Sequence, residues 1–262
     1  MFQFTPMVRN LLIANVAVFF LSLQLGGLNF LALYPLDNPN FKPWQLVTYM
    51  FMHSTINMGH IFSNMLGLIS LGPLLEQRWG PKRFLTYWLI CGLGAGILYN
   101  GLRTYELRRM QHDIEVFQQE PTDLHLQDFV EHNVSENAPA FDPVIRQLHQ
   151  TPDDFRLIQG VVTTLQEVYR RSLSSPMVGA SGALFGIMLA FAFFFPNTEL
   201  MVFPLPIPIK AKYFVVLYGL YEFYFGVHRV PGDNVAHFAH LGGMLVGLVV
   251  LLLWQRNRTR LY

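Results

Sequence analysis

Six long apolar stretches limit this chain to one broad class of fold. They cover residues 10–33, 56–75, 83–102, 179–196, 211–228 and 235–254. About 20 mainly apolar residues are enough for an α-helix to cross the hydrocarbon core of a bilayer. The chain is 52% hydrophobic and only 13% charged, about half the charged fraction of an ordinary soluble domain. We therefore predict an all-α membrane protein with six transmembrane helices, surrounded by the lipid bilayer.

The positions of the basic residues predict how these helices are oriented. Lysine and arginine are enriched on the cytoplasmic side of membrane proteins. They lie before the first span, between the second and third, before the fifth and after the last: Arg9, Arg78, Lys82, Arg83, Lys210, Lys212 and Arg256. If six spans alternate, all these ends share one side, so both termini are expected in the cytoplasm. Because the sequence shows no organelle targeting segment, we expect a bacterial inner membrane. The net charge of +1 does not indicate a nucleic-acid partner.

One region interrupts the apolar pattern. Residues 103–172 contain no long apolar run and hold 12 of the 17 acidic residues, together with seven arginines. We predict a soluble, partly helical, extracytoplasmic insert there, which divides the chain into 1–102 (spans one to three), 103–172 (the insert) and 173–262 (spans four to six). Amphipathic spacing predicts a helix over 155–169, whereas prolines and polar residues predict a loop over 133–143. The insert's histidines lack metal-ligand spacing and are interpreted as surface residues: His112, His125, His132 and His149.

Polar side chains inside the apolar stretches are candidates for function, because burying such groups at membrane depth is costly. The set contains His53, Asn57, His60, Asn64, Ser181, Glu222, His237 and His240. A hydroxyl, imidazoles and a carboxamide at one membrane depth would supply a nucleophile, a base and oxyanion donors for acyl transfer. His60 and Asn64 are four residues apart and therefore share a helix face. Glu222 is expected to be protonated or to lie near the outer interface.

Two glycine stripes predict which histidine faces the serine. Gly182 and Gly186 follow Ser181 in the fourth span, and Gly243 and Gly247 lie three and seven residues after His240 in the sixth, on its own face. Small residues at this spacing let two membrane helices approach closely. If the stripes meet, His240 and not His237 reaches Ser181, and Phe185 can stack on its imidazole. The single cysteine, Cys91, is expected to be a buried packing residue in the third span.

These residues together resemble the rhomboid family of intramembrane serine proteases. Gly179-Ala-Ser181-Gly182 is similar to the family's GxSG motif, and His240-Leu-Gly-Gly to its base helix. Further similarities are the histidine-histidine-asparagine set in the second span, Trp44 ahead of it and the ExRxG turn after it: His53, His60, Asn64 and 76–80. The resemblance implies a six-helix fold that lacks the 103–172 insert. It also implies membrane-protein substrates and a reaction without cofactor or metal.

The resemblance further implies roles for single residues. Ser181 would be the nucleophile and His240 the general base, in a dyad with no aspartate. The backbone of Ser181, with His60 and Asn64, would form the oxyanion hole. Two positions depart from the family pattern: His53 precedes His60 by seven residues where five are usual, and Phe185 stands where tyrosine is frequent. We therefore assign His53, Gly179, Gly182, Phe185, Gly243 and Gly247 supporting roles, and leave open whether His53 and His237 contribute to catalysis.

Two other functions fit parts of the sequence. A catalytically inactive relative that binds membrane proteins would share the fold, but it would not need Ser181 and His240 together. A small-solute transporter would show paired repeats and helices broken at the midplane, and neither pattern is found. The sequence gives no information on the physiological substrate, the cleavage position, the oligomeric state or the role of the insert. We expect Glu76 and Arg78 to pair with backbone groups and with one another at the inner turn.

Overall fold

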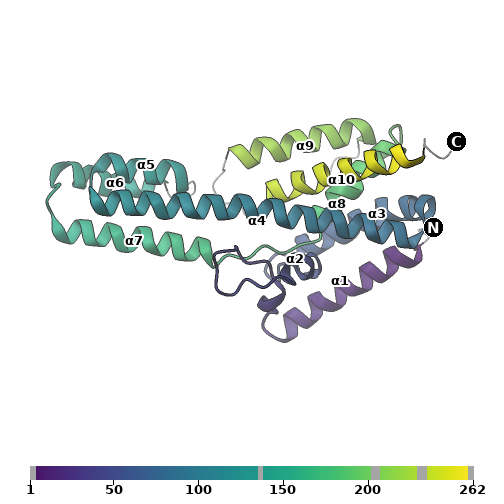
Figure 1. The fold of residues 1–262 in the computed structure, drawn as a ribbon, viewed down its shortest axis with the longest axis horizontal. Coiled ribbons are helices and arrows are strands. Elements are labelled where there is room, and N and C mark those ends of the chain that lie inside the picture. The colour runs from purple at the N-terminus through teal and green to yellow at the C-terminus, as the bar shows by residue number, and fades with distance from the viewer. Residues whose placement is uncertain (1–3, 135–137, 202–206, 229–234, 259–262) are drawn as a thin grey trace.

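The protein is mostly helical and elongated, with α1 beginning and α10 ending near the same end (Figure 1). The computed structural model describes residues 4–134, 138–201, 207–228 and 235–258. The elements in chain order are α1 (Pro6–Gln24), the 3-10 turn η1 (Asn29–Leu31), α2 (Gln45–Thr48), η2 (Tyr49–Phe51), α3 (Met58–Trp79), α4 (Pro81–Gln119), α5 (Asp123–Asn133), α6 (Ala138–Gln150), α7 (Phe155–Leu173), α8 (Ser181–Phe194), β1 (Glu199–Met201), β2 (Pro208–Lys210), α9 (Ala211–Val227) and α10 (His237–Arg258).

Four of these helices are long and apolar enough to cross a membrane, among the residues that the structure describes. They are α1, α3, α4 and residues 237–256 of α10. The other two apolar helices are shorter, with 14 residues in α8 and 17 in α9. The predicted all-α membrane protein is thus confirmed as a mostly helical chain with four candidate spans, and it departs from all-α in the short antiparallel pair β1–β2. The assignment of α8 and α9 as spans remains a prediction.

Two predicted span boundaries differ from the helices observed. The first span was placed over 10–33, but α1 ends at Gln24 because Gly26 and Gly27 adopt φ angles of 69° and 112°. Positive φ is accessible to glycine and terminates a right-handed helix. The third span was placed over 83–102, but α4 continues unbroken to Gln119. The expected boundary between 102 and 103 therefore lies inside one helix.

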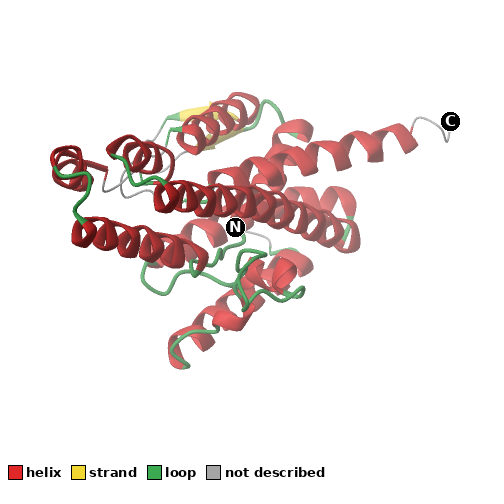
Figure 2. Cartoon of the chain, turned by 60° about the vertical axis from the view of Figure 1, so that its left-hand side comes forward, coloured by secondary structure: helices red, strands yellow, loops and turns green. Residues whose placement is uncertain are grey.

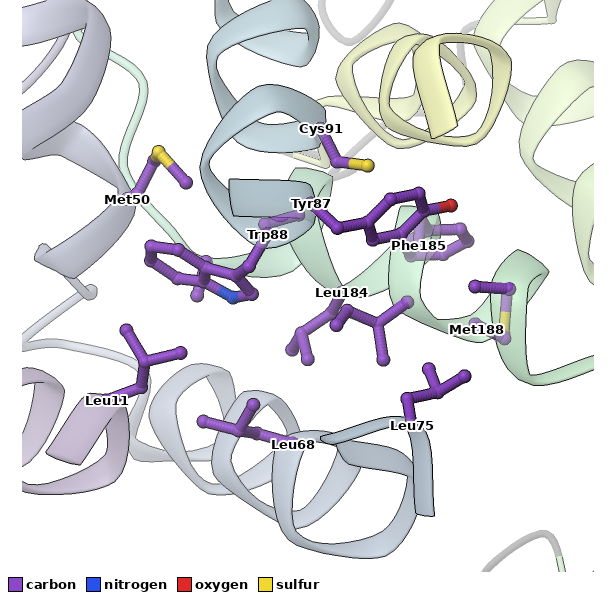
Figure 3. Close-up of a cluster of buried hydrophobic side chains, with 14 of the residues drawn as sticks. Leu11, Met50, Leu68, Leu75, Tyr87, Trp88, Cys91, Leu184, Phe185 and Met188 are labelled. Carbon is purple, nitrogen blue, oxygen red and sulfur yellow. The ribbon is translucent and has the colours of Figure 1, made fainter. Parts of the chain in front are cut away.

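The apolar helices form one hydrophobic core around α4, α8 and α10. These three helices pack against one another, and α3 packs against α8 from the other side. Trp88, Tyr87 and Cys91 of α4 are fully buried. Figure 3 shows them beside Leu184 and Phe185 of α8 and above Leu68 and Leu75 of α3. Cys91 is thus the buried packing residue that the sequence predicted.

The beginning of α1 is held by a carboxylate of α3. Glu76 is buried and accepts hydrogen bonds from the backbone N–H groups of Met7 and Val8, each at 2.8 Å, and from the Thr5 hydroxyl. An anion at this position satisfies donors that have no partner within the helix. Arg78 does not pair with Glu76 as expected: its guanidinium lies over the Phe194 ring, 4.5 Å from the centroid.

A second hydrophobic core lies at the opposite end of the molecule. The C-terminal part of α4 packs with α5, α6 and α7 (Figures 1 and 2), and we call this unit the α4–α7 extension. Its fully buried side chains include Phe117, Leu126, Phe129 and Leu165. The helix predicted over 155–169 is present as α7, which begins at the N-cap Asp154.

The prediction of a loop over 133–143 is wrong for residues 138–143. Residues 138–143 belong to α6 although Pro143 lies inside that helix. Phe141, Val144, Ile145 and Leu148 recur at helical spacing and pack against the extension's core. Burial of this face outweighs the hydrogen bond that a proline removes. Residues 135–137, within the same predicted loop, lie outside the described residues.

Candidate active site

The segment before α8 places Ser181 at the first residue of that helix. Leu33 and Met177 exchange backbone hydrogen bonds of 2.9 and 2.8 Å, and the Gly179 N–H donates to the Tyr49 carbonyl at 3.0 Å. Gly179 has φ +130°, a conformation that L side chains rarely adopt. A Cβ there would also lie 2.7 Å from His60 Nε2. Glycine at position 179 is therefore required by both the backbone and the neighbouring ring.

The two glycine stripes face one another, as their spacing predicted. A Cβ on Gly243 would overlap the Gly182 carbonyl, and a Cβ on Gly247 would lie 3.2 Å from Gly186 Cα. A Cβ on Gly186 would lie 2.5 Å from Cys91 Sγ of α4 and 3.1 Å from the Gly243 carbonyl oxygen of α10. The space that side chains would occupy is filled by neighbouring atoms. Helices α8 and α10 can approach this closely only because these positions lack a Cβ.

This contact brings Ser181 and His240 together. Ser181 Oγ and His240 Nε2 are 2.8 Å apart, a hydrogen-bond distance. The Phe185 ring lies parallel to the imidazole, with centroids 4.2 Å apart and an interplanar angle of 8°. His240 is 8% exposed. The histidine chosen by the glycine spacing is the one in contact with the serine.

The other ring nitrogen of His240 meets a carboxylate. His240 Nδ1 lies 2.8 Å from Glu222 Oε2, and His237 Nδ1 lies 2.6 Å from the same oxygen. Glu222 is 1% exposed and therefore does not lie at a water-facing surface. The dyad implied by the resemblance has no acidic member, whereas the structure places a glutamate where one would stand. The sequence signal was an ionisable residue inside an apolar helix, but nothing in the sequence paired Glu222 with a particular histidine.

His60 lies beside Gly179, and its ring orientation can be assigned from its partner. The Ser54 N–H donates to His60 Nδ1 at 3.4 Å, a long hydrogen bond. A neutral imidazole with Nδ1 as acceptor carries its proton on Nε2. That nitrogen is the one near Gly179, on the side of Ser181. His60 thus presents an N–H donor towards the beginning of α8.

Asn64, one turn further along α3, carries a free amide donor. It is 5% exposed, and its Nδ2 makes no hydrogen bond within the described part of the chain. Buried amide donors without partners are rare in folded proteins. Asn57, which was grouped with the functional candidates, instead caps α3 by accepting from the Gly59 N–H at 3.0 Å.

His53 packs against His60, whereas the side chain that hydrogen-bonds to Ser181 is His240. The two rings are in edge contact with centroids 5.1 Å apart. His53 is 2% exposed, and neither ring nitrogen hydrogen-bonds to any residue that the structure describes. Burial, aided by the nearby His60, lowers the pKa of His53 to about 4. His53 is therefore neutral near pH 7, and its place supports a packing role beside His60.

One group of side chains in the described ranges could hold a metal ion. Its ligand atoms come from Glu222, His237 and His240 and lie within 4.8 Å of one another. The 2.6 and 2.8 Å separations are hydrogen-bond distances. Neighbouring ligand atoms of tetrahedral zinc would be roughly 3.3 Å apart. The geometry therefore favours two N–H donors on one carboxylate oxygen.

In the extension, His149 pairs with Asp123 at 2.7 Å on the surface.

Comparisons with known proteins find similarity over most of the chain. The family model described as "Rhomboid domain" matches residues 40–106 and 155–257. RHOMBOID-like protein 12, mitochondrial, of Arabidopsis thaliana is 24% identical over 257 residues, which cover 96% of this chain and 58% of the relative. A mitochondrial rhomboid protein of Schizosaccharomyces pombe is 25% identical over 229 residues, covering 82% of this chain and 52% of the relative.

A further relative carries an activity in its name. Rhomboid-like protease 3 of Toxoplasma gondii is 39% identical over 59 residues, which cover 22% of each chain. This chain spans only about half the length of the two relatives that cover most of it. Both of those are named as mitochondrial, so the relatives do not support the expected bacterial inner membrane.

Proposed function

Because this chain belongs to the rhomboid family, we propose that it is a serine endopeptidase that cleaves transmembrane segments of other membrane proteins. The observation that carries the proposal is the 2.8 Å contact between Ser181 Oγ and His240 Nε2. A hydroxyl hydrogen-bonded to an imidazole is the arrangement of a nucleophile and its general base. The contact lies at the beginning of an apolar helix, within a bundle of membrane-spanning length.

The reaction proceeds through an acyl-enzyme. Ser181 Oγ attacks the carbonyl carbon of the scissile peptide while its proton moves to His240 Nε2. The tetrahedral intermediate then breaks its C–N bond, and the imidazolium gives the proton to the leaving amine. Water attacks the resulting ester with His240 again as base, which releases the acid and restores Ser181.

The negative charge on the tetrahedral oxygen requires hydrogen-bond donors. The first backbone N–H groups of α8, beginning with Ser181, have no partner within the helix. His60 Nε2 lies beside Gly179, just ahead of this helix end, and Asn64, one turn further along α3, has an Nδ2 that is free to donate. In this proposal the three donors form the oxyanion hole.

The proposed topology explains why the serine would be below the membrane surface. Helices α8 and α9 complete a six-span bundle, in which both termini share the side of the α3–α4 turn and the extension lies in water on the other side. Helix α8 is about 21 Å long, shorter than the roughly 30 Å hydrocarbon core. At least one end of α8 must then lie within the bilayer, and in this proposal it is the Ser181 end, where a substrate helix must unwind to expose a carbonyl. Small and helix-breaking residues are expected near the cut.

Labelling with a fluorophosphonate probe, combined with cleavage of a model transmembrane substrate, tests this proposal. Ser181→Ala is expected to remove labelling and to lower cleavage at least about 10³-fold, and His240→Ala to do nearly the same. Ser175→Ala, an exposed serine ahead of the site, is the matched control and keeps both signals. Cleavage that survives in Ser181→Ala refutes the proposal. An unlabelled, inactive wild-type protein would favour the inactive membrane-protein-binding relative instead.

A further inference from the structure

Glu222 is a buried carboxylate in an aromatic stretch of α9. Its neighbours Tyr221, Phe223 and Tyr224 are 50–57% exposed, whereas Glu222 itself is 1% exposed. These three aromatic side chains of α9 thus face outward, whereas its one acid is directed towards α10. Removing an unpaired carboxylate from water costs several kcal/mol, so a glutamate persists at such a position only with good partners.

Both observed partners of Glu222 come from the first turn of α10. His237 Nδ1 and His240 Nδ1 lie 2.6 and 2.8 Å from one oxygen, Oε2. A carboxylate can only accept, so each Nδ1 is the donor and carries a hydrogen. A neutral His240 with its proton on Nδ1 has its lone pair on Nε2, where Ser181 Oγ lies at 2.8 Å. The carboxylate therefore selects the tautomer in which His240 can accept the serine proton.

Two contacts hold the His240 ring in this orientation. Phe185 stacks on its face at 4.2 Å, and Glu222 binds its Nδ1 edge. His237 supplies a second N–H to the same oxygen and so anchors the carboxylate. A stacked aromatic alone accepts two ring orientations that differ by a half-turn about the Cβ–Cγ bond, and the hydrogen bond at Nδ1 selects one of them.

We propose that Glu222 is a positioning residue of the site, held by His237, which orients His240 and stabilises its cationic form. This inference rests on the proposed protease function. When Ser181 gives its proton to Nε2, the Nδ1 proton stays on His240 and Glu222 remains a carboxylate. The imidazolium and the carboxylate then face one another in a buried site, where the attraction is stronger than in water. The protein thus uses a serine, a histidine and a glutamate contributed by three helices.

The test compares conservative changes at two equally buried glutamates. Glu222→Gln keeps the shape and removes the charge, and Glu222→Asp keeps the charge on a shorter side chain. Glu76→Gln is the matched control, because Glu76 is also buried, at 2% exposure, but binds the beginning of α1. Each variant is measured for kcat and KM on the transmembrane substrate, for its rate of fluorophosphonate labelling, and for its thermal unfolding temperature.

We expect Glu222→Gln to lower kcat and the labelling rate by about 100-fold or more, with KM within about threefold of wild type, because the tautomer and the charge are affected but substrate contacts are not. Glu222→Asp should recover part of kcat. Glu76→Gln should lower the unfolding temperature and leave kcat of the folded protein within about threefold. A normal kcat in Glu222→Gln overturns the positioning role. A Glu222→Gln protein whose unfolding temperature falls and whose KM rises as strongly as its kcat falls overturns it too.

The outcomes also separate this inference from the proposed function. If wild type cleaves through Ser181 while Glu222→Gln matches it, only the role of Glu222 fails. If no substrate is cut, the labelling rates alone test the role of Glu222. If wild type is neither labelled nor active, the proposed function fails and the positioning role falls with it.

Discussion

The helix bundle and the α4–α7 extension are held together in opposite ways. At the α8–α10 contact, Gly182 and Gly243 meet without a side chain between them. In the extension, Phe117, Phe129 and Leu165 fill the interior completely. If α8 and α10 both cross the bilayer as proposed, lipid provides no hydrophobic driving force between them, and close backbone packing supplies the attraction. In water, burial of large apolar side chains supplies it.

Charge is distributed in opposite ways as well. In the bundle, Glu222 is buried between two histidines, and in the extension Glu167 forms exposed pairs with Arg170 and Arg171. Exposed pairs contribute little to stability, whereas a buried carboxylate is costly unless it has donors. Each buried carboxylate of the bundle has such donors: Glu222 lies where chemistry is proposed, and Glu76 binds the beginning of α1. The extension's surface charge agrees with the proposal that it lies in water.

The largest effect is expected from adding one methyl group at the helix contact. In Gly243→Ala the new Cβ would overlap the Gly182 carbonyl, so α8 and α10 must separate and the Ser181–His240 hydrogen bond lengthens. A displacement of about 1 Å at a reacting pair can cost about 100-fold in rate. We expect at least that loss in fluorophosphonate labelling. Gly101→Ala on α4, where nothing lies within 4 Å, is the matched control and should label normally.

Shortening a buried side chain in the extension should lower the stability of the extension strongly and change the labelling of Ser181 little. Leu165 is fully buried in α7, and Leu165→Ala is expected to cost about 2–5 kcal/mol of local stability. Limited trypsin digestion should then cut within 120–173 much faster than in the control Leu124→Ala, whose side chain is 66% exposed. Labelling of Ser181 should stay within about threefold of wild type.

This second prediction can fail in an informative way. The extension touches the loop before α2 through Arg108, whose guanidinium binds both oxygens of Asp37 at 3.0 and 3.1 Å, and through Asn38 Nδ2, which donates to the Leu173 carbonyl at 2.8 Å. The same loop holds Met177 ahead of Ser181 through Leu33. If labelling of Leu165→Ala falls along with its protease resistance, the extension stabilises the site through this loop, and the two regions are not independent.

The parts that could be predicted from the sequence are those set by spacing along one helix. Gly243 and Gly247 share a face with His240 whatever surrounds the helix, so the contact between His240 and Ser181 followed from helical geometry. The Phe185 stack followed from the same geometry. Local spacing also predicted α7, because its apolar residues recur at helical intervals.

The parts that could not be predicted depend on how separate helices are rotated. The sequence marks Glu222 as unusual within its aromatic segment, but the rotation of α9 against α10 is set by packing of many residues. Likewise, α6 forms through Pro143 because its apolar face packs against α5 within the extension's core. Nothing in 97–110 stops a helix, so the end of the third span could not be read from local sequence.

The smallest predicted effect has the opposite sign to the first. Gly160 lies inside α7, and a Cβ there would meet nothing within 4 Å. Gly160→Ala should therefore stabilise the extension by about 0.5–1 kcal/mol, because alanine loses less conformational entropy in a helix interior. Slower trypsin cutting within 120–173 would show this, with unchanged labelling of Ser181. If Gly160→Ala instead speeds cutting, α7 needs a bare backbone as α8 and α10 do. The contrast between the two regions would then not hold for this helix.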